Sequence, residues 1–431
     1  MVTVNERKTT MVKPAEATPK RAIWLANLDL FFKTVQTPNV YFYRPNGASN
    51  FFDPSVLKEA LSKALVPFYP VAGRLRHDDN GRPEIYCNAE GVVFIEAESA
   101  SSIDDFDDFR PSLELQKLAP IIDCSGAISS HPLCMLQVTY FKCGGVALGV
   151  GMLHCVADGI SAIHFVNTWC HMARGLDLAI PPFLDRTLLG PRKPPQHSFD
   201  HIEYQLPKLS KSQDNGDNFI VSQFKLPKEK VDKLKVKAKE DCNDTINYST
   251  YEVLASHIWK CACIAIGYPD EEEIRLTTAT EGRNRLQPPL PPGYFGNVIF
   301  TAAAAASAGD LKSKALGFAT KKVHDTLARM DDEYLRSSID FLEFYPYLLN
   351  GAHQARHDAK FNVLGITSWV RIPVYVADFG WGKPFYMGPT RIIFEGKAYI
   401  LPNTVNDGSY IVAIGLKPKN MKLFEKLLCD V

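Results

Sequence analysis

The chain has 431 residues, of which 46% are hydrophobic and 22% are charged. This length exceeds what one hydrophobic core usually holds, so two globular domains are expected. The 48 basic residues balance the 48 acidic ones, and a net charge of zero gives no overall field that would attract nucleic acid or an anionic membrane surface.

The N-terminal residues are polar and lack the apolar core of a secretory signal peptide. No segment approaches the roughly 18 uninterrupted apolar residues that a membrane span needs. The ten cysteines are scattered along the chain, and reduced, mostly buried thiols are expected. These features predict a cytoplasmic protein that contacts neither a membrane nor nucleic acid.

The first half alternates strand-like and helix-like patterns. Strands are expected at 40–43, 85–87, 91–97, 136–142 and 146–153, and helices at 54–65 and 160–174. The segments 85–87 and 91–97 read as a short pair. Gly144-Gly145 predicts a hairpin between 136–142 and 146–153.

Proline residues and a polar tract interrupt regular structure after residue 175. We therefore expect a crossover linker at 181–218, between an N-terminal domain at 1–180 and a C-terminal domain at 219–431. The second half predicts strands at 220–226, 365–370, 392–394, 398–401 and 410–414, and helices at 228–239, 250–266, 310–328, 332–345 and 420–428. The alanine-rich tract 302–308 reads as a passage from strand to loop. The alternation predicts an α/β protein with mixed sheets flanked by helices.

His154 follows the apolar run 146–151 in the string Met-Leu-His-Cys-Val-Ala-Asp-Gly. A histidine where a strand ends can face a cleft, and a neutral imidazole can accept a proton from an alcohol or amine. The four-residue match alone favours a hydrogen-bonded core histidine. The strand-to-turn junction, the apolar surroundings and Gly159 directly before a helix favour a general base.

Asp158 has two interpretations. It could orient the His154 imidazole, or it could tie down the turn through a salt bridge at a helix N-terminus. Because four residues across a tight turn tend to point the two side chains apart, the structural role is favoured.

A second unusual string is Asp378-Phe-Gly380-Trp381-Gly382, whose glycines suggest positive φ angles or a close backbone approach. A loop whose aromatic side chains fill a domain contact is favoured over direct chemistry. No P-loop, no GxGxxG motif and no metal-spaced histidines occur, so neither a metal nor a dinucleotide cofactor is expected.

The histidine motif at 154–159, followed far downstream by the string at 378–382, resembles the plant BAHD acyltransferase family. The segments at 50–53, 68–74, 141–145, 290–297 and 365–369 are similar to its hydroxycinnamoyl-CoA:shikimate/quinate hydroxycinnamoyltransferase branch. The resemblance implies two chloramphenicol-acetyltransferase-like domains, each a mixed sheet flanked by helices, with a tunnel at their interface. Acyl-CoA would enter from one mouth and the acceptor from the other, with His154 as the catalytic base at the middle.

The resemblance also assigns supporting roles. Asp158 would pair with Arg283 or Arg285 and, with Gly159, hold the shape of the site. The residues Asp378, Gly380, Trp381 and Gly382 would support the fold away from the chemistry. Arg371 would pair with an acceptor carboxylate, and the side chains of Thr37, Asn39 and Tyr41 would line the acceptor side.

The implied activity is transfer of a p-coumaroyl or caffeoyl group from CoA to a hydroxyl of a carboxylated acceptor such as shikimate or quinate, in a ternary complex on a monomer. Acyl-CoA would be a co-substrate, with no metal and no cofactor. The branch commonly has His-Thr-Pro-Ser where Gln36-Thr-Pro-Asn39 stands, and a glycine pair where Thr390-Arg391 stands. These departures leave other acceptors open, namely hydroxyphenyllactate, malate or an amine, as well as a non-catalytic relative that binds acyl-CoA.

Overall fold

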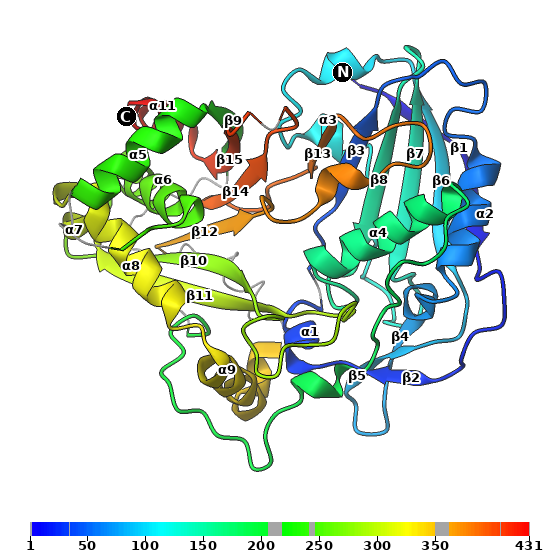
Figure 1. The fold of residues 1–431 in the computed structure, drawn as a ribbon, viewed down its shortest axis with the longest axis horizontal. Coiled ribbons are helices and arrows are strands. Elements are labelled where there is room, and N and C mark those ends of the chain that lie inside the picture. Colours follow the sequence, from blue (N-terminus) through cyan, green and yellow to red (C-terminus); the bar gives the residue numbers. More distant parts are fainter. Residues whose placement is uncertain are drawn as a thin grey trace.

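The computed structural model describes residues 2–33, 35–205, 218–240, 246–349, 362–405 and 407–430. Within these residues the chain forms two six-stranded sheets and one three-stranded sheet. The two large sheets lie side by side, one built mainly from each half of the sequence, and helices pack against both (Figure 1). This is the expected α/β architecture with two mixed sheets.

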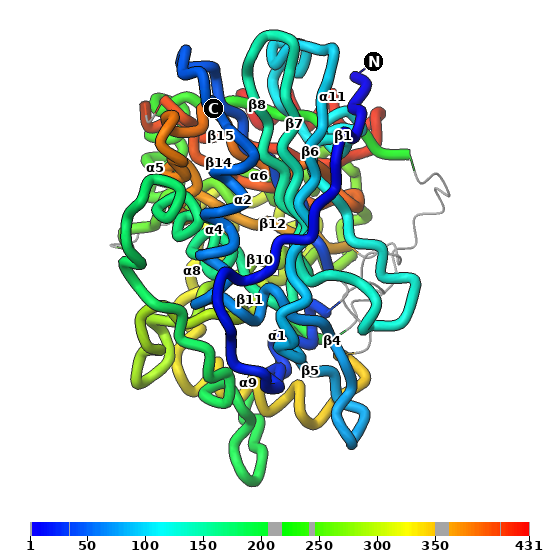
Figure 2. The backbone as a smooth tube through the Cα atoms, turned by 90° about the vertical axis from the view of Figure 1, so that its right-hand side faces the viewer, coloured from blue at the N-terminus to red at the C-terminus, as the bar shows by residue number. Residues whose placement is uncertain are grey.

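The first sheet has the spatial order β1 (Val4–Val12), β6 (Val92–Ser99), β7 (Cys134–Phe141), β8 (Val146–Met152), β3 (Asn39–Tyr43) and β13 (Tyr386–Pro389). Only β6 and β7 run parallel; the other neighbours are antiparallel. Figure 2 looks onto this half, where β1, β6, β7 and β8 follow one another across the sheet. The predicted hairpin is confirmed as β7 and β8.

The predicted pairing of 85–87 with 91–97 is wrong. Strand β5 (Pro83–Tyr86) lies between β2 (Ala22–Trp24) and β4 (Arg74–His77) in the small sheet, whereas β6 belongs to the first large sheet. Between them Ala89 and Gly91 both take positive φ angles, 56° and 106°. The chain therefore changes sheets at a point where a short loop suggested a hairpin.

Two helices of the first half pack on each other, α2 (Pro54–Ala64) and α4 (Gly159–Ala173). The indole N–H of Trp169 on α4 donates a 2.8 Å hydrogen bond to the carbonyl of Leu57 on α2. The helices α1 (Asn27–Phe31) and α3 (Leu113–Gln116) are short, as are the 3-10 helices η1 (Tyr69–Ala72), η2 (Ile103–Phe106), η3 (Arg186–Leu189), η4 (Pro346–Leu349) and η5 (Val374–Val376).

The second sheet has the order β11 (Ile299–Ser307), β10 (Glu273–Glu281), β12 (Val363–Ser368), β14 (Lys397–Pro402), β15 (Tyr410–Leu416) and β9 (Ile220–Leu226). Strand β12 runs parallel to both β10 and β14. The accompanying helices are α5 (Lys228–Glu240), α6 (Thr250–Ile266), α7 (Ala308–Ser313), α8 (Leu316–Ala328), α9 (Asp332–Phe344) and α11 (Pro418–Cys429). Helix α6 begins at a capping box in which Ser249 and Glu252 satisfy each other's backbone N–H groups.

The alanine-rich tract is not a passage into a loop but part of β11. Most of its alanines are buried, and α8 packs against this strand. Small side chains let a helix lie close to a sheet, so here packing overrides the weak strand propensity of alanine. The predicted helix at 310–328 is divided into α7 and α8, and 392–394 is not a strand. Strands β1, β2, β4, β10 and β13 were not predicted.

Strand β13 crosses back from the second half and pairs antiparallel with β3 in the first sheet. The sheet of the first half is therefore completed by residues close to the C-terminus of the chain. The boundaries at 1–180 and 219–431 stay a prediction, and residues 206–217 of the predicted linker lie outside the described residues. Of the helices described, none is long and apolar enough to cross a membrane.

Candidate active site

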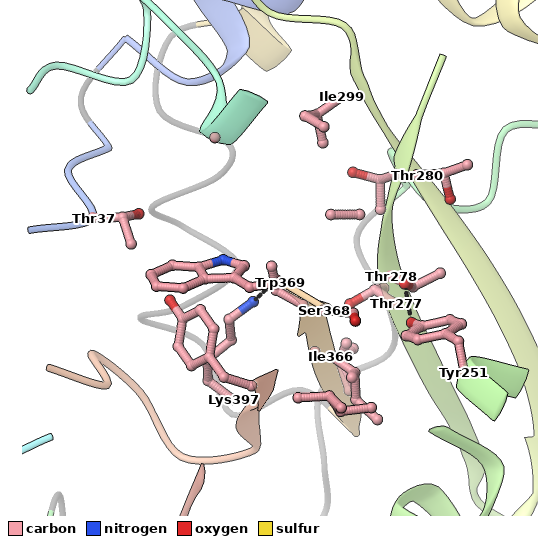
Figure 3. Close-up of a pocket in the computed structure, with 18 of the residues that line it drawn as sticks. Thr37, Tyr251, Thr277, Thr278, Thr280, Ile299, Ile366, Ser368, Trp369 and Lys397 are labelled. Carbon is pink, nitrogen blue, oxygen red and sulfur yellow. Dashed lines mark hydrogen bonds between the residues drawn. The ribbon is translucent and has the colours of Figure 1, made fainter. Parts of the chain in front are cut away.

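A cavity of about 1620 Å³ opens where the two halves meet. Its walls include His154 from the first half and Arg371 from the second. Figure 3 shows Thr37 of the first half with Thr278 and Trp369 of the second around the same cavity. His154 is therefore not sealed in a core, as the alternative interpretation required. In the described part of the chain, no group of three or more His, Cys, Asp or Glu side chains is placed to hold a metal ion.

Strand β8 brings His154 to the cavity. All seven of its residues are buried. A side chain at Gly149 or Gly151 would overlap the carbonyl oxygen of Leu118 or Pro120, so these glycines let the segment after α3 lie directly against the strand. Just past the strand, the backbone N–H of His154 donates a 3.0 Å hydrogen bond to Val35. The imidazole therefore stands on an anchored backbone.

The His154 ring is held by Asn297, which lies between β10 and β11 in the sequence. The Nδ1 atom of His154 is 2.9 Å from Oδ1 of Asn297. The Nδ2 atom of Asn297 donates to the carbonyl of His154 at 2.7 Å and to Oδ1 of Asp29 at 2.9 Å. Because both of these partners are acceptors, the amide nitrogen must face them, and Oδ1 accepts the proton on Nδ1 of His154.

The consequence concerns the other ring nitrogen. With its proton on Nδ1, the neutral imidazole has its lone pair on Nε2, and no hydrogen bond from a described residue occupies that atom. Burial lowers the pKa of His154 below its ordinary value of 6.5, although the Asp158 charge and the Asn297 hydrogen bond act in the opposite direction. The ring also packs on Phe32, with centroids 4.7 Å apart. His154 thus presents a neutral, oriented imidazole to the cavity at physiological pH.

Two further residues that the sequence did not single out complete this support. The Oδ1 atom of Asp29 also accepts the backbone N–H of Asn297, and it lies 3.2 Å from Nη1 of Arg186. Arg186 donates to the carbonyls of Cys155 and Val156, directly after His154. A buried ion pair therefore fixes both Asn297 and the turn that carries His154. Asn297 ends the segment 290–297 noted in the sequence, but nothing local to Asp29 or Arg186 reveals their contact.

Asp158 pairs with Arg283 and not with Arg285. The two carboxylate oxygens of Asp158 lie 2.8 and 3.0 Å from the two Nη atoms of Arg283, whereas Arg285 donates to the carbonyls of Leu327 and Met330. Burial alone would raise the pKa of Asp158, but the Arg283 guanidinium and two backbone N–H groups lower it. The carboxylate is therefore charged and bidentate.

Asp158 is also the N-cap of α4, where its side chain accepts the backbone N–H of Ser161. Its other oxygen accepts the N–H of Val298, next to Asn297. The carboxylate thus joins the start of α4 to the segment that holds His154, and it makes no direct hydrogen bond to the imidazole. Gly159, the first residue of α4, lines the cavity.

The predicted acceptor residues divide into two groups. Thr37, Asn39 and Arg371 line the cavity, and Arg371 is exposed to it. Tyr41 does not belong to the wall: it is fully buried in the core of the first half, and burial raises the pKa of its hydroxyl. Asn39 and Tyr41 share one face of β3, but Tyr41 lies two residues deeper, about 7 Å along the strand. The prediction that Tyr41 lines the acceptor side is therefore wrong.

The loop at 378–382 lies away from the cavity wall. Oδ1 of Asp378 accepts the N–H groups of Gly380 and Gly382, which take φ angles of 103° and 109°. The Trp381 ring packs on Phe52 at 5.2 Å, and its indole N–H donates to Asn50. The loop therefore docks a segment of the second half onto the first, in the manner of a domain contact.

The sequence pattern of the Transferase family matches residues 1–429. This chain belongs to the BAHD acyltransferase family. As a family member it is an acyl-CoA-dependent acyltransferase, and its BAHD fold is similar to vinorine synthase, with a TM-score of 0.76 at 23% identity over 98% of this chain and 96% of the other.

Relatives of this BAHD acyltransferase cover its full length. A shikimate O-hydroxycinnamoyltransferase of Nicotiana tabacum is 54% identical over 99% of both chains. A hydroxycinnamoyl-CoA:5-hydroxyanthranilate N-hydroxycinnamoyltransferase of Avena sativa is 46% identical over 99% of this chain and 100% of the other. The two relatives are named for the same acyl group and for different acceptors.

Proposed function

We propose that this BAHD acyltransferase transfers a hydroxycinnamoyl group, p-coumaroyl or caffeoyl, from CoA to a hydroxyl of a carboxylated acceptor such as shikimate or quinate. The observation that carries the chemistry is the orientation of His154. Its Nδ1 contacts Asn297, while no described residue occupies the Nε2 lone pair beside the cavity. The names of both full-length relatives support the acyl group, and the name of the Nicotiana tabacum relative supports the acceptor class.

In the proposed reaction, Nε2 of His154 removes the proton of the acceptor hydroxyl as that oxygen attacks the thioester carbonyl carbon. The carbonyl oxygen becomes an oxyanion in the tetrahedral intermediate. When the intermediate collapses, the carbon–sulfur bond breaks and the imidazolium returns its proton to the departing CoA thiolate. The histidine is regenerated, and the products are an ester and free CoA.

The cavity suits a direct transfer. Both halves of the chain contribute to its wall, so donor and acceptor can be held together, and orientation of two bound reactants removes much of the entropic cost of their encounter. No covalent acyl-enzyme is required. Acyl-CoA is therefore assigned as a co-substrate, without a resident cofactor or metal.

Arg371 is proposed to bind the acceptor carboxylate. It is exposed to the cavity and forms no ion pair with another described residue, and a planar guanidinium binds a carboxylate through two parallel hydrogen bonds. Thr37 and Asn39 are assigned to the acceptor side of the same cavity. A cationic acceptor such as a polyamine would be repelled by Arg371.

The remaining sequence-predicted residues are assigned to support. Asp158 and Gly159 keep the start of α4 against the segment before β11, and the turn at Asp378, Gly380, Trp381 and Gly382 keeps the chain after β12 docked on the first half. The chain is proposed to act as a monomer in the cytoplasm.

A second candidate is transfer to the amine of an aromatic amino acid, favoured by the full-length relative from Avena sativa. A panel separates the two. The purified protein would be given p-coumaroyl-CoA with shikimate, quinate, hydroxyphenyllactate, malate, 5-hydroxyanthranilate or spermidine, with release of free thiol followed and products identified by mass.

The hydroxyl-transfer proposal expects the highest kcat/KM for a carboxylated alcohol and loss of thiol release in the His154→Ala protein. A higher kcat/KM for 5-hydroxyanthranilate would establish the second candidate instead. Binding of p-coumaroyl-CoA with no transfer to any member of the panel would favour a non-catalytic relative.

A further inference from the structure

Lys397 is a further cation on the cavity wall. This residue begins β14, beside β12, in parallel register with Gly365. A Cβ added at Gly365 would be in ordinary contact with Cδ of Lys397, at 3.6 Å, so the lysine stem lies along the sheet surface beside β12. Figure 3 shows the side chain extending from the sheet toward the ring of Trp369.

Among the described residues, the neighbours of the ammonium group are polar or aromatic, and none is an acid. Its Nζ donates a 2.5 Å hydrogen bond to Oγ1 of Thr367 and lies 5.0 Å from the centre of the Tyr399 ring. Trp369 packs edge-on against Tyr399, with centroids 5.5 Å apart. Among the residues that the structure describes, no carboxylate forms a salt bridge with Lys397. The positive charge therefore faces the cavity without a counter-ion from the described part of the chain.

The acids of the cavity wall are already engaged. Glu281 and Asp158 bind Arg283, Glu252 binds His324, Glu203 binds His201 and Tyr334, and Glu395 accepts the backbone N–H of Lys417. None of these contacts leads to Lys397. Burial lowers the pKa of Lys397 to about 8, so the ammonium form still predominates at pH 7, and an anion bound beside it would favour that form further.

We propose that Lys397 is a specificity-determining residue that binds the carboxylate of the acceptor, as a second cationic anchor on the wall that carries Trp369 and Arg371. The proposal rests on the proposed function and deepens it, because it explains why an acidic acceptor is held. A carboxylate suits the site better than the phosphates of CoA. The CoA phosphates carry several negative charges and need several hydrogen-bond donors. Lys397 offers one ammonium group beside the rings of Trp369 and Tyr399.

The test compares an acid with its neutral ester. Lys397→Met keeps much of the stem and removes the charge. KM would be measured for shikimate, for its methyl ester and for p-coumaroyl-CoA. We expect the KM of shikimate to rise by about 10- to 100-fold, the scale of a lost charge-assisted hydrogen bond, with little change for the ester or the donor. Lys397→Arg should recover most of the loss, and Lys233→Met, on the exposed face of α5, serves as the matched control.

Equal effects on shikimate and its ester would overturn the proposal, and so would a rise in the KM of p-coumaroyl-CoA alone, which would assign the charge to CoA. If Lys397→Met did not fold, Lys397→Gln would give the same comparison. Assays of the wild-type protein distinguish a failure of the Lys397 proposal from a failure of the proposed function. If the wild-type protein transfers to shikimate and Lys397→Met leaves the KM of shikimate unchanged, only the Lys397 proposal is refuted. If the wild-type protein transfers to no carboxylated alcohol, the proposed function is refuted.

Discussion

His154 and Asn297 are 143 residues apart in the sequence, yet Nδ1 of the histidine lies 2.9 Å from Oδ1 of the asparagine. This contact ties the end of β8 to the segment before β11, across the line where the two halves meet. It also decides which ring nitrogen can accept a proton. The orientation of the His154 ring is therefore a property of the packed domains rather than of the motif that contains it.

Replacing the histidine tests the base directly. We expect His154→Ala to lower kcat by about 10²- to 10⁴-fold, the usual contribution of a positioned general base. The melting temperature should change little, because the ring borders a cavity rather than filling a core. Turnover at the wild-type rate would remove His154 from the mechanism.

The pH profile tests the charge state of the same group. In the proposed mechanism the neutral imidazole is the active form. Burial lowers the pKa of His154 below 6.5, so we expect activity to be retained at pH 7 and lost as pH falls through the lowered pKa. We expect the acid limb of kcat/KM to have its midpoint below pH 6.5. A midpoint above 6.5 would mean that the charged neighbours outweigh burial.

The hydrogen bond between Asn297 and His154 predicts that Asn297 positions the imidazole. In Asn297→Ala the ring loses its anchor and populates both neutral tautomers, so kcat should fall by about 10- to 100-fold. The acid limb should move as well, because the hydrogen bond that favours the charged ring is gone. The exposed variant Asn80→Ala is the control. A loss of stability with an unmoved pH profile would mean that Asn297 supports the fold only.

The Asp158 pair predicts a loss of stability. Arg283→Met leaves the fully buried Asp158 carboxylate without its cation, which should cost about 3–5 kcal/mol in the free energy of unfolding. The matched surface variant Arg76→Met breaks the exposed pair with Glu84 and should cost about 1 kcal/mol or less. Urea denaturation followed by circular dichroism compares the two. Equal costs would contradict the bidentate buried pair.

Arg371 predicts a loss of acceptor binding. In Arg371→Ala the KM for shikimate should rise by about 10- to 100-fold, while hydrolysis of p-coumaroyl-CoA by water persists. Steady-state kinetics with shikimate and a neutral alcohol acceptor provide the comparison. The proposed carboxylate-binding role of Arg371 is refuted if the KM of the neutral acceptor rises as much as the KM of shikimate.

Much of the fold could be predicted from local pattern. Strands β3, β7, β8 and β9 and helices α2, α4, α5 and α6 lie within a few residues of their expected positions. Each has a continuous periodic run with a clear stop. Strand β10 was missed because polar threonine and glutamate residues mix with its apolar ones, and β11 because alanine gives a weak strand signal. The position of His154 at the end of β8 followed from the same local reasoning.

What the sequence by itself determined was the local frame: two domains' worth of chain, a strand that ends at His154, and a helix that starts at Asp158. Only the tertiary structure decided that Arg283 rather than Arg285 meets Asp158, that Tyr41 lies below the wall, and that β13 completes the first sheet. Side chains close in sequence are oriented by the period of their own strand or helix. Contacts between distant segments depend on how whole helices and strands pack, and no local pattern in one sequence indicates them.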